Sequence, residues 1–163
     1  MAVEVPTNLK ELTALVRRGE GKTLEFKRST GELKEGMQTV CAFLNGSGGM
    51  VIFGVRPDGA IQGQDVADQT LRDIAQSTDR FEPAVHLSIH RVGVKDHREV
   101  LSVVVEDDQR TGPFTFEGRP YERVSSTTRR MPQGRYEKLL LDRAHGKRRW
   151  ENEPADEIGR AHV

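Results

Sequence analysis

The sequence lacks the residues on which several common kinds of protein depend. Its 163 residues include one cysteine, which excludes a disulfide within the chain and any cysteine-rich zinc site. No apolar run approaches the roughly 20 residues needed to cross a bilayer, and the first residues do not have the pattern of a signal peptide. We therefore expect a cytoplasmic protein that makes no use of a membrane.

Two nucleotide-binding motifs, GxxxxGK[ST] and GxGxxG, are also missing. A glycine-rich run does occur at residues 45–49, but it follows a helical pattern and precedes an apolar strand. Phosphate-binding loops have the opposite order, strand, glycines and then helix. We therefore interpret this run as a helix end and a close-packing joint. Because only 6% of the residues are aromatic, base stacking is not expected to dominate any nucleic-acid binding.

Charge is balanced overall and uneven along the chain. The formal net charge is zero, yet residues 107–150 hold eleven Lys and Arg against six Asp and Glu, and residues 151–163 hold one against four. A basic region suits a polyanion partner, although a solvated charged face would give the same pattern. The length suits one domain, predicted over residues 1–145, with a charged, frayed tail over 146–163.

Apolar spacing predicts the secondary structure. A stripe beginning at Leu9, with Asn8 and Glu11 spaced as a capping box, indicates a helix ending near Arg18. Further helices are predicted over 36–44, 65–78 and 134–143, and strands over 23–28, 50–55, 85–90, 100–105, 113–116 and 121–124. The predicted fold class is α+β, a mainly antiparallel sheet with helices packed on one face.

Five pieces in this order carry a resemblance to a known family. They are a helix, Glu20 with Leu24–Lys27, Cys41–Asn45 leading to Gly48–Gly49, Gly54–Val55 with Asp58–Gly59 ahead of Ile61–Gly63, and Tyr121–Ser126. Together they resemble the Schlafen AlbA-like domain, over roughly residues 9–141. The resemblance implies a nucleic-acid-binding α+β domain.

The resemblance also implies a catalytic site. Schlafen nucleases cleave tRNA and rRNA with three carboxylates and a divalent metal, and Glu20 and Glu25 match the two glutamates. The third acid should follow the Gly-Val strand directly, where this chain has Arg56, and the nearest acid is Asp58. The implied ligands of Mg²⁺ or Mn²⁺ are therefore Glu20, Glu25 and Asp58, with Lys27 placed to neutralise developing charge. In the alternative interpretation, Glu25 and Lys27 form an ion pair on an exposed strand face.

A second set of residues suits contacts to phosphate, because guanidinium groups and hydroxyls both donate to phosphate oxygens. The set is Arg28, Arg123, Ser125, Ser126, Arg129, Arg130 and Arg135. Together with the resemblance, it predicts a metal-dependent endoribonuclease acting on structured RNA such as tRNA in preference to DNA. A homodimer is expected because one small domain offers only a shallow groove. The alternative is a non-catalytic DNA- or RNA-binding regulatory module.

Overall fold

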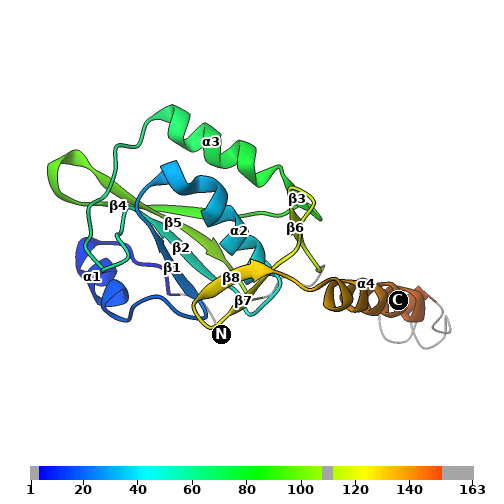
Figure 1. Ribbon diagram of the computed structural model, residues 1–163. Coiled ribbons are helices and arrows are strands. Elements are labelled where there is room, and N and C mark those ends of the chain that lie inside the picture. Colours follow the sequence, from blue (N-terminus) through cyan, green and yellow to red (C-terminus); the bar gives the residue numbers. More distant parts are fainter. Residues whose placement is uncertain (1–3, 108–111, 152–163) are drawn as a thin grey trace, which may run out of the picture.

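The computed structural model describes residues 4–107 and 112–151 (Figure 1). Its helices are α1 Leu9–Arg17, α2 Leu33–Leu44, α3 Asp68–Thr78 and α4 Gln133–Glu151, with short 3-10 turns η1 Thr30–Glu32 and η2 Lys95–His97. Its strands are β1 Leu24–Lys27, β2 Gly49–Phe53, β3 Phe81–Glu82, β4 Ser88–Gly93, β5 Glu99–Val105, β6 Thr115–Phe116, β7 Tyr121–Val124 and β8 Thr127–Arg130.

A four-stranded sheet in the order β1-β2-β5-β4 forms the centre of the fold. Strand β1 pairs parallel to β2, with Glu25 opposite Val51, and the other two pairings are antiparallel. Two further pairs, β3–β6 and β7–β8, are antiparallel hairpins or short ladders beside the main sheet. The α+β class with mainly antiparallel pairing is therefore confirmed.

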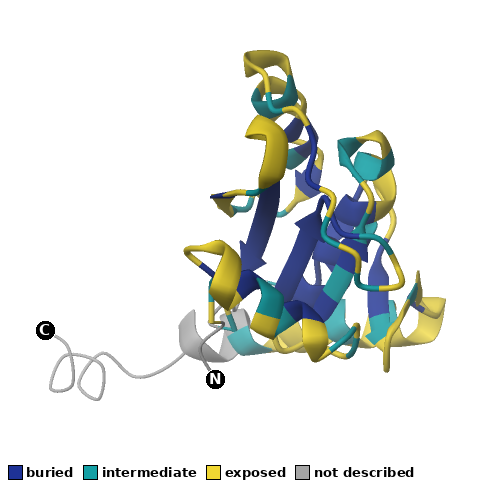
Figure 2. Cartoon of the chain, turned by 90° about the vertical axis from the view of Figure 1, so that its left-hand side faces the viewer, coloured by how far each residue is buried: buried dark blue, intermediate teal, exposed yellow. Residues whose placement is uncertain are grey.

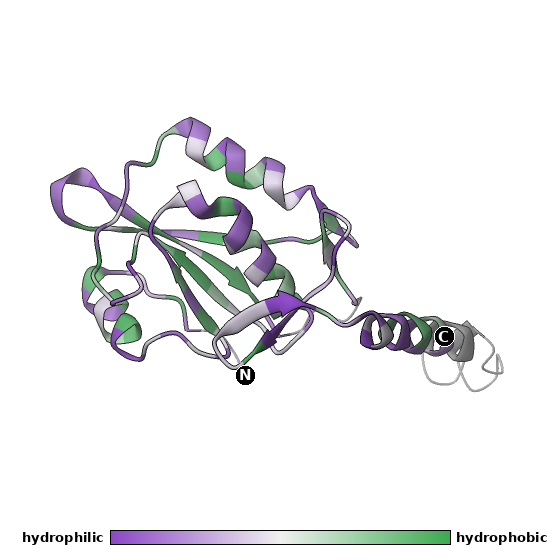
Figure 3. Cartoon of the chain, viewed as in Figure 1, coloured by the Kyte–Doolittle hydropathy of each residue, from purple (hydrophilic) through white to green (hydrophobic). Residues whose placement is uncertain are grey.

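The helices divide between the two faces of the sheet. Phe43 of α2 and Ile74 of α3 pack with Phe53 on one face, whereas Leu12 of α1 packs with Ile52 on the other. The prediction of helices on one face alone was wrong in this respect. The physical reason is visible in β2, whose five residues are all buried, because both of its faces need an apolar cover (Figures 2 and 3).

Several element boundaries differ from those predicted. Helix α3 begins at Asp68, three residues after its predicted start at residue 65. Its N-cap residue is Ala67 and not Asp65. Strand β4 begins at Ser88, and strand β8 was not predicted at all. Helix α4 continues to Glu151, past the predicted end at residue 143 and through the start of the predicted frayed tail. Residues 152–163 of that tail lie outside the described residues, and the division into domain and tail stays a prediction.

The start of α1 carries half of the predicted capping box. The side chain of Asn8 accepts a hydrogen bond from the Glu11 N–H at 2.9 Å. The Glu11 carboxylate instead accepts from the backbone N–H and the hydroxyl of Thr7, at 2.8 and 2.7 Å. Asn8 therefore caps the helix, and Glu11 fixes the segment before it.

The glycine-rich joint lets helix α2 and strand β2 approach their neighbours closely. Gly48 has a φ of +85°, and its N–H donates to the Phe43 carbonyl at 3.1 Å. A Cβ on Gly48 would lie 2.7 Å from the carbonyl oxygen of Val105, and one on Gly49 would lie 2.8 Å from that of Thr23. The joint is thus a helix end and a packing point, as its order in the sequence indicates.

Replacing Gly48 with alanine should destabilise the fold by about 2 kcal/mol or more, since the new Cβ meets a backbone oxygen and the backbone conformation disfavours a side chain. Gly134→Ala is the matched control, because a Cβ there meets nothing within 4 Å and the position is helical. Urea unfolding measures both changes. A Gly48→Ala protein as stable as the wild type would contradict the packing role.

Candidate nucleic-acid interface

Arg123 of β7 fastens the β7–β8 hairpin to the main sheet. Its nitrogens donate to one hydroxyl and two carbonyl oxygens, those of Thr128, Gly21 and Leu24. Its Nη1 also lies 2.8 Å from Oε1 of Glu25, and the guanidinium carbon lies 5.3 Å from the centre of the Phe43 ring. Only 4% of its side chain is exposed, so Arg123 offers little surface to a phosphate, and its role as a nucleic-acid contact stays a prediction.

Asn45, which follows α2, forms a second attachment. Its Nδ2 donates to the carbonyl oxygens of Phe114 and Tyr121, at 3.0 and 2.8 Å, and its Oδ1 accepts from the Phe114 N–H at 2.7 Å. The end of α2 is therefore held beside the start of the hairpin. The family-like run ending at Asn45 acts here as a structural joint.

Cys41, in the same run, is buried against this joint. Its Sγ lies 3.4 Å from the Phe114 carbonyl oxygen, to which it donates. Burial raises the pKa of the Cys41 thiol to about 12, because the charged thiolate is poorly solvated there. The thiol is therefore not a nucleophile at neutral pH.

A groove of about 550 Å³ opens between the hairpin, the end of α2, the loop before β1 and the start of α4. Its lining residues are Lys22, Asn45, Gly46, Ser47, Glu122, Arg123, Val124, Arg129, Pro132 and Arg135. Lys22, Arg129 and Arg135 are exposed cations on its walls. These elements come from four separate parts of the chain, and their meeting gathers positive charge that the sequence spreads out.

Among the described residues that line the groove, one is acidic, Glu122 of β7, whose side chain is 10% exposed. Its Oε2 lies 2.8 Å from Nη2 of Arg129, and its Oε1 lies 3.1 Å from Nε of Arg135. The two guanidinium groups are thus joined to one carboxylate. Both remain more than half exposed.

The other predicted phosphate contacts lie around the groove or away from it. Ser125 and Ser126 are exposed at the hairpin turn, next to the groove residue Val124, and Ser125 has a φ of +57°. Arg130 is exposed and makes no ion pair with the described residues. Arg28 does not line the groove, and its backbone N–H donates to Oε2 of Glu32 at 2.8 Å. Arg129 and Arg135 are therefore the predicted cations that the fold does bring together.

Lys22 and the loop of residues 45–47 were missed as groove residues. Neither belongs to a basic cluster in the sequence, and the loop was assigned to packing alone. They line the groove because the fold brings them next to the β7–β8 hairpin. No local pattern could have identified them.

The predicted carboxylate residues take part in other contacts. Glu25 lies 3.0 Å from Nζ of Lys27 through Oε2, in addition to its contact with Arg123. This is the ion pair of the alternative interpretation, although on a mostly covered strand face. Glu20 accepts the Phe26 N–H at 2.8 Å, and Asp58 accepts the Ala60 N–H at 3.0 Å.

These carboxylates do not fit one metal-ligand set. Glu20 and Asp58 line a cavity of about 340 Å³ between the end of α1 and the turn at residues 57–59, and Glu25 does not line it. Within residues 4–107 and 112–151, no three His, Cys, Asp or Glu side chains are grouped to hold a metal ion. Glu25 also has two cations at the positions where a metal ion would have to approach.

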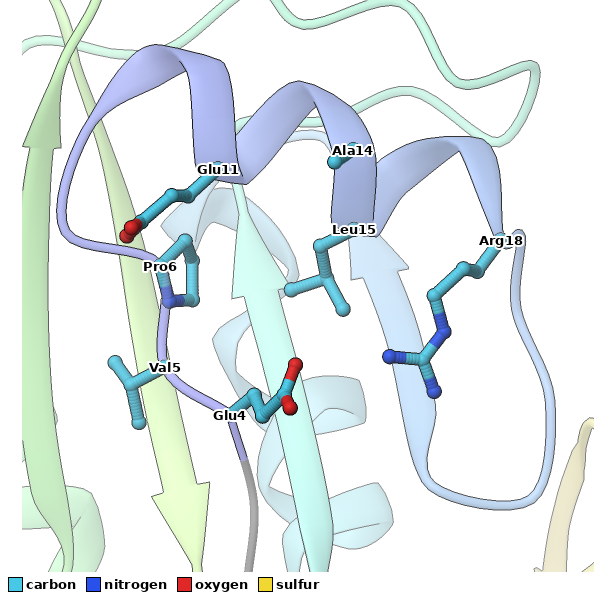
Figure 4. Close-up of a pocket in the computed structure, with 7 residues that line it drawn as sticks. All are labelled: Glu4, Val5, Pro6, Glu11, Ala14, Leu15 and Arg18. Atoms are coloured by element: carbon cyan, nitrogen blue, oxygen red, sulfur yellow. The ribbon is translucent and has the colours of Figure 1, made fainter.

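A third cavity, of about 450 Å³, lies between the segment of residues 4–6 and α1 (Figure 4). Val5, Pro6 and Leu15 give it an apolar wall, and Glu4, Glu11 and Arg18 bring charge to it. None of the predicted site residues lines this cavity.

Comparison with known protein families gives one decisive result. A family model described as Schlafen, AlbA_2 matches residues 20–132, which is more than half of the chain. The chain belongs to the Schlafen AlbA_2 family. The match spans β1 through β8, so it includes the hairpin and most of the groove of this AlbA_2 domain. Membership of the family indicates a nucleic-acid-related function.

The fold is shared with a solved structure. The DIP2311 protein from Corynebacterium diphtheriae is 18% identical, with a TM-score of 0.53 over 72% of this chain and 26% of its own. The N-terminal domain of a RecG-related protein from Nitrosomonas europaea is 22% identical, with a TM-score of 0.48 over 75% of this chain and 92% of its own. The chain thus spans about a quarter of the Corynebacterium protein. No curated protein matches it.

Over the described residues, no helix is both long enough and apolar enough to cross a bilayer.

Arg123→Ala should destabilise the AlbA_2 domain by about 3 kcal/mol, because the mostly buried Glu25 loses one of its two cations and the Gly21 and Leu24 carbonyl oxygens each lose a donor. Arg130→Ala, on the neighbouring strand, should change stability by less than about 0.5 kcal/mol, since Arg130 is exposed. Thermal and urea unfolding distinguish the two. Equal stability of both variants would show that Arg123 does not fasten the hairpin.

Proposed function

We propose that this domain binds nucleic acid through its phosphate backbone along the groove of Lys22, Arg129 and Arg135. The observation that carries the proposal is the meeting of these three exposed cations on the walls of one groove. Guanidinium groups and ammonium groups are the side chains that hold phosphate oxygens best.

The composition of the groove supports backbone recognition of structured RNA such as tRNA. Among the described residues, its lining includes no aromatic side chain on which bases would stack. Ser125 and Ser126 are exposed in the turn that follows the groove residue Val124, and their hydroxyls suit contacts to ribose hydroxyls and phosphates. The preference for RNA over DNA and the expected homodimer both stay predictions, since no described contact distinguishes these alternatives.

Lys22→Ala and Arg129→Ala should each weaken tRNA binding about fivefold at 0.1 M salt and reduce the dependence of affinity on salt by about one released ion. Fluorescence anisotropy with labelled tRNA at several salt concentrations measures both quantities. Lys34→Ala is the matched control, because Lys34 is exposed at the opposite end of α2 from the groove. Equal losses in all three variants would contradict a localised site.

Metal-dependent RNA cleavage is a second candidate, favoured by one observation. Glu20 and Asp58 line the same cavity, and carboxylate oxygens are the ligands that Mg²⁺ and Mn²⁺ prefer. The candidate needs Glu25 to leave Lys27 and Arg123 if all three family carboxylates are to act together.

Incubation of the domain with tRNA and Mn²⁺, beside an EDTA control, separates the two candidates. If the domain is a binding module, we expect intact tRNA and the same affinity with Mn²⁺ and with EDTA. Cleavage that EDTA abolishes, that Glu20→Gln and Asp58→Asn remove and that Glu117→Gln retains would establish the nuclease instead. Glu117 is a suitable control because its carboxylate pairs with Lys34 and Arg80, away from the acidic cavity.

A further inference from the structure

Glu122 is an unexpected residue in a groove that holds a polyanion. Its carboxylate is nine-tenths covered and lies among the cations that would contact phosphate. By charge alone it should repel the ligand and weaken binding. Its contacts indicate a different effect.

Each oxygen of Glu122 anchors one arginine by the inner part of its guanidinium group. Oε2 accepts from Nε of Arg129 at 2.8 Å and lies 2.8 Å from its Nη2. Oε1 lies 3.1 Å from Nε of Arg135, on the first turn of α4. The arginine side chains are 56% and 53% exposed, and Nη1 of each makes no hydrogen bond with the described residues. The outer nitrogens are therefore free to donate to a ligand.

Anchoring matters because an arginine side chain is long and flexible. An unanchored arginine loses rotamer freedom when it binds a phosphate, whereas one already held by a carboxylate loses less. The covered carboxylate, in turn, needs both cations, because a buried charge without a partner is costly. Glu122 thus holds Arg129 of the hairpin and Arg135 of α4 in one arrangement.

We propose that Glu122 is a positioning residue of the nucleic-acid groove, which orients Arg129 and Arg135 toward phosphate and thereby strengthens binding despite its negative charge. This inference rests on the proposed binding function. If Glu122 acted only through its charge, its removal should strengthen binding of the polyanion. If Glu122 positions the arginines, its removal should weaken binding.

The test compares Glu122→Gln with Glu117→Gln, which removes the same charge from a carboxylate that also lies between two cations. We expect Glu122→Gln to bind labelled tRNA about tenfold more weakly than the wild type, as expected for two arginines that lose their anchor. Glu117→Gln should bind as tightly as the wild type or slightly more tightly. Tighter or unchanged binding by Glu122→Gln would overturn the inference.

A double variant that lacks both arginines distinguishes a positioning role of Glu122 from a general role in folding. In Arg129→Ala/Arg135→Ala, the substitution Glu122→Gln should cause no further loss, because no anchored arginine remains. A further tenfold loss there would mean that Glu122 acts through the fold, and the inference would be wrong.

If Glu122→Gln does not fold, as judged by its thermal unfolding, Arg129→Lys asks the same question. It keeps the charge and removes the two-nitrogen anchor, so it should also weaken binding several-fold, and unchanged affinity would overturn the inference. The proposed function fails separately, if the wild type itself does not bind tRNA. If the wild type binds tRNA and these variants bind equally well, the positioning role of Glu122 is wrong while the proposed function stands.

Discussion

The guanidinium of Arg123 makes the contacts on which the arrangement of the groove depends. It joins the β7–β8 hairpin to the carbonyl oxygens before and within β1, to Glu25 and to the ring of Phe43 in α2. Asn45 adds a second link from the end of α2 to the hairpin. The groove lies where these joined segments meet. Partly buried hydrogen bonds hold its walls in their relative positions.

The basic residues of this region therefore fall into two kinds that composition does not distinguish. Arg123 is covered and has its charge compensated within the fold, whereas Arg129 and Arg135 are anchored to Glu122 and remain open to solvent. The zero net charge of the chain is compatible with a polyanion partner because only the local arrangement of charge matters at the groove. Glu122 lowers the net positive charge of the groove, and it also contacts both arginines and holds them near each other.

Sequence reasoning identified what depends on local patterns. The stripe of α1 and the alternation of Leu24 and Phe26 are periodic, so both elements were predicted close to their observed places. Strand β8 was missed because its residues, Thr127 to Arg130, are all polar and show no apolar alternation. Spacing along the sequence could not predict the roles of Glu25 and Arg123, because the two side chains pair with each other although they lie far apart in the chain. The groove likewise forms between distant parts of the chain. Of its exposed cations, only Arg129 and Arg135 lie in a basic segment that the sequence reveals.

Strand β1 lies at one edge of the main sheet, and carboxylates accept one N–H group within the strand and one directly after it. Glu20 accepts that of Phe26, and Glu32 accepts that of Arg28, two residues further on. Exposed strand edges are the places where folded proteins add foreign strands and aggregate, and negative charges on an edge oppose this. Glu20 and Glu32 therefore occupy backbone donors at this edge and place negative charge beside it. A change at Glu20 would alter the strand edge as well as the neighbouring cavity.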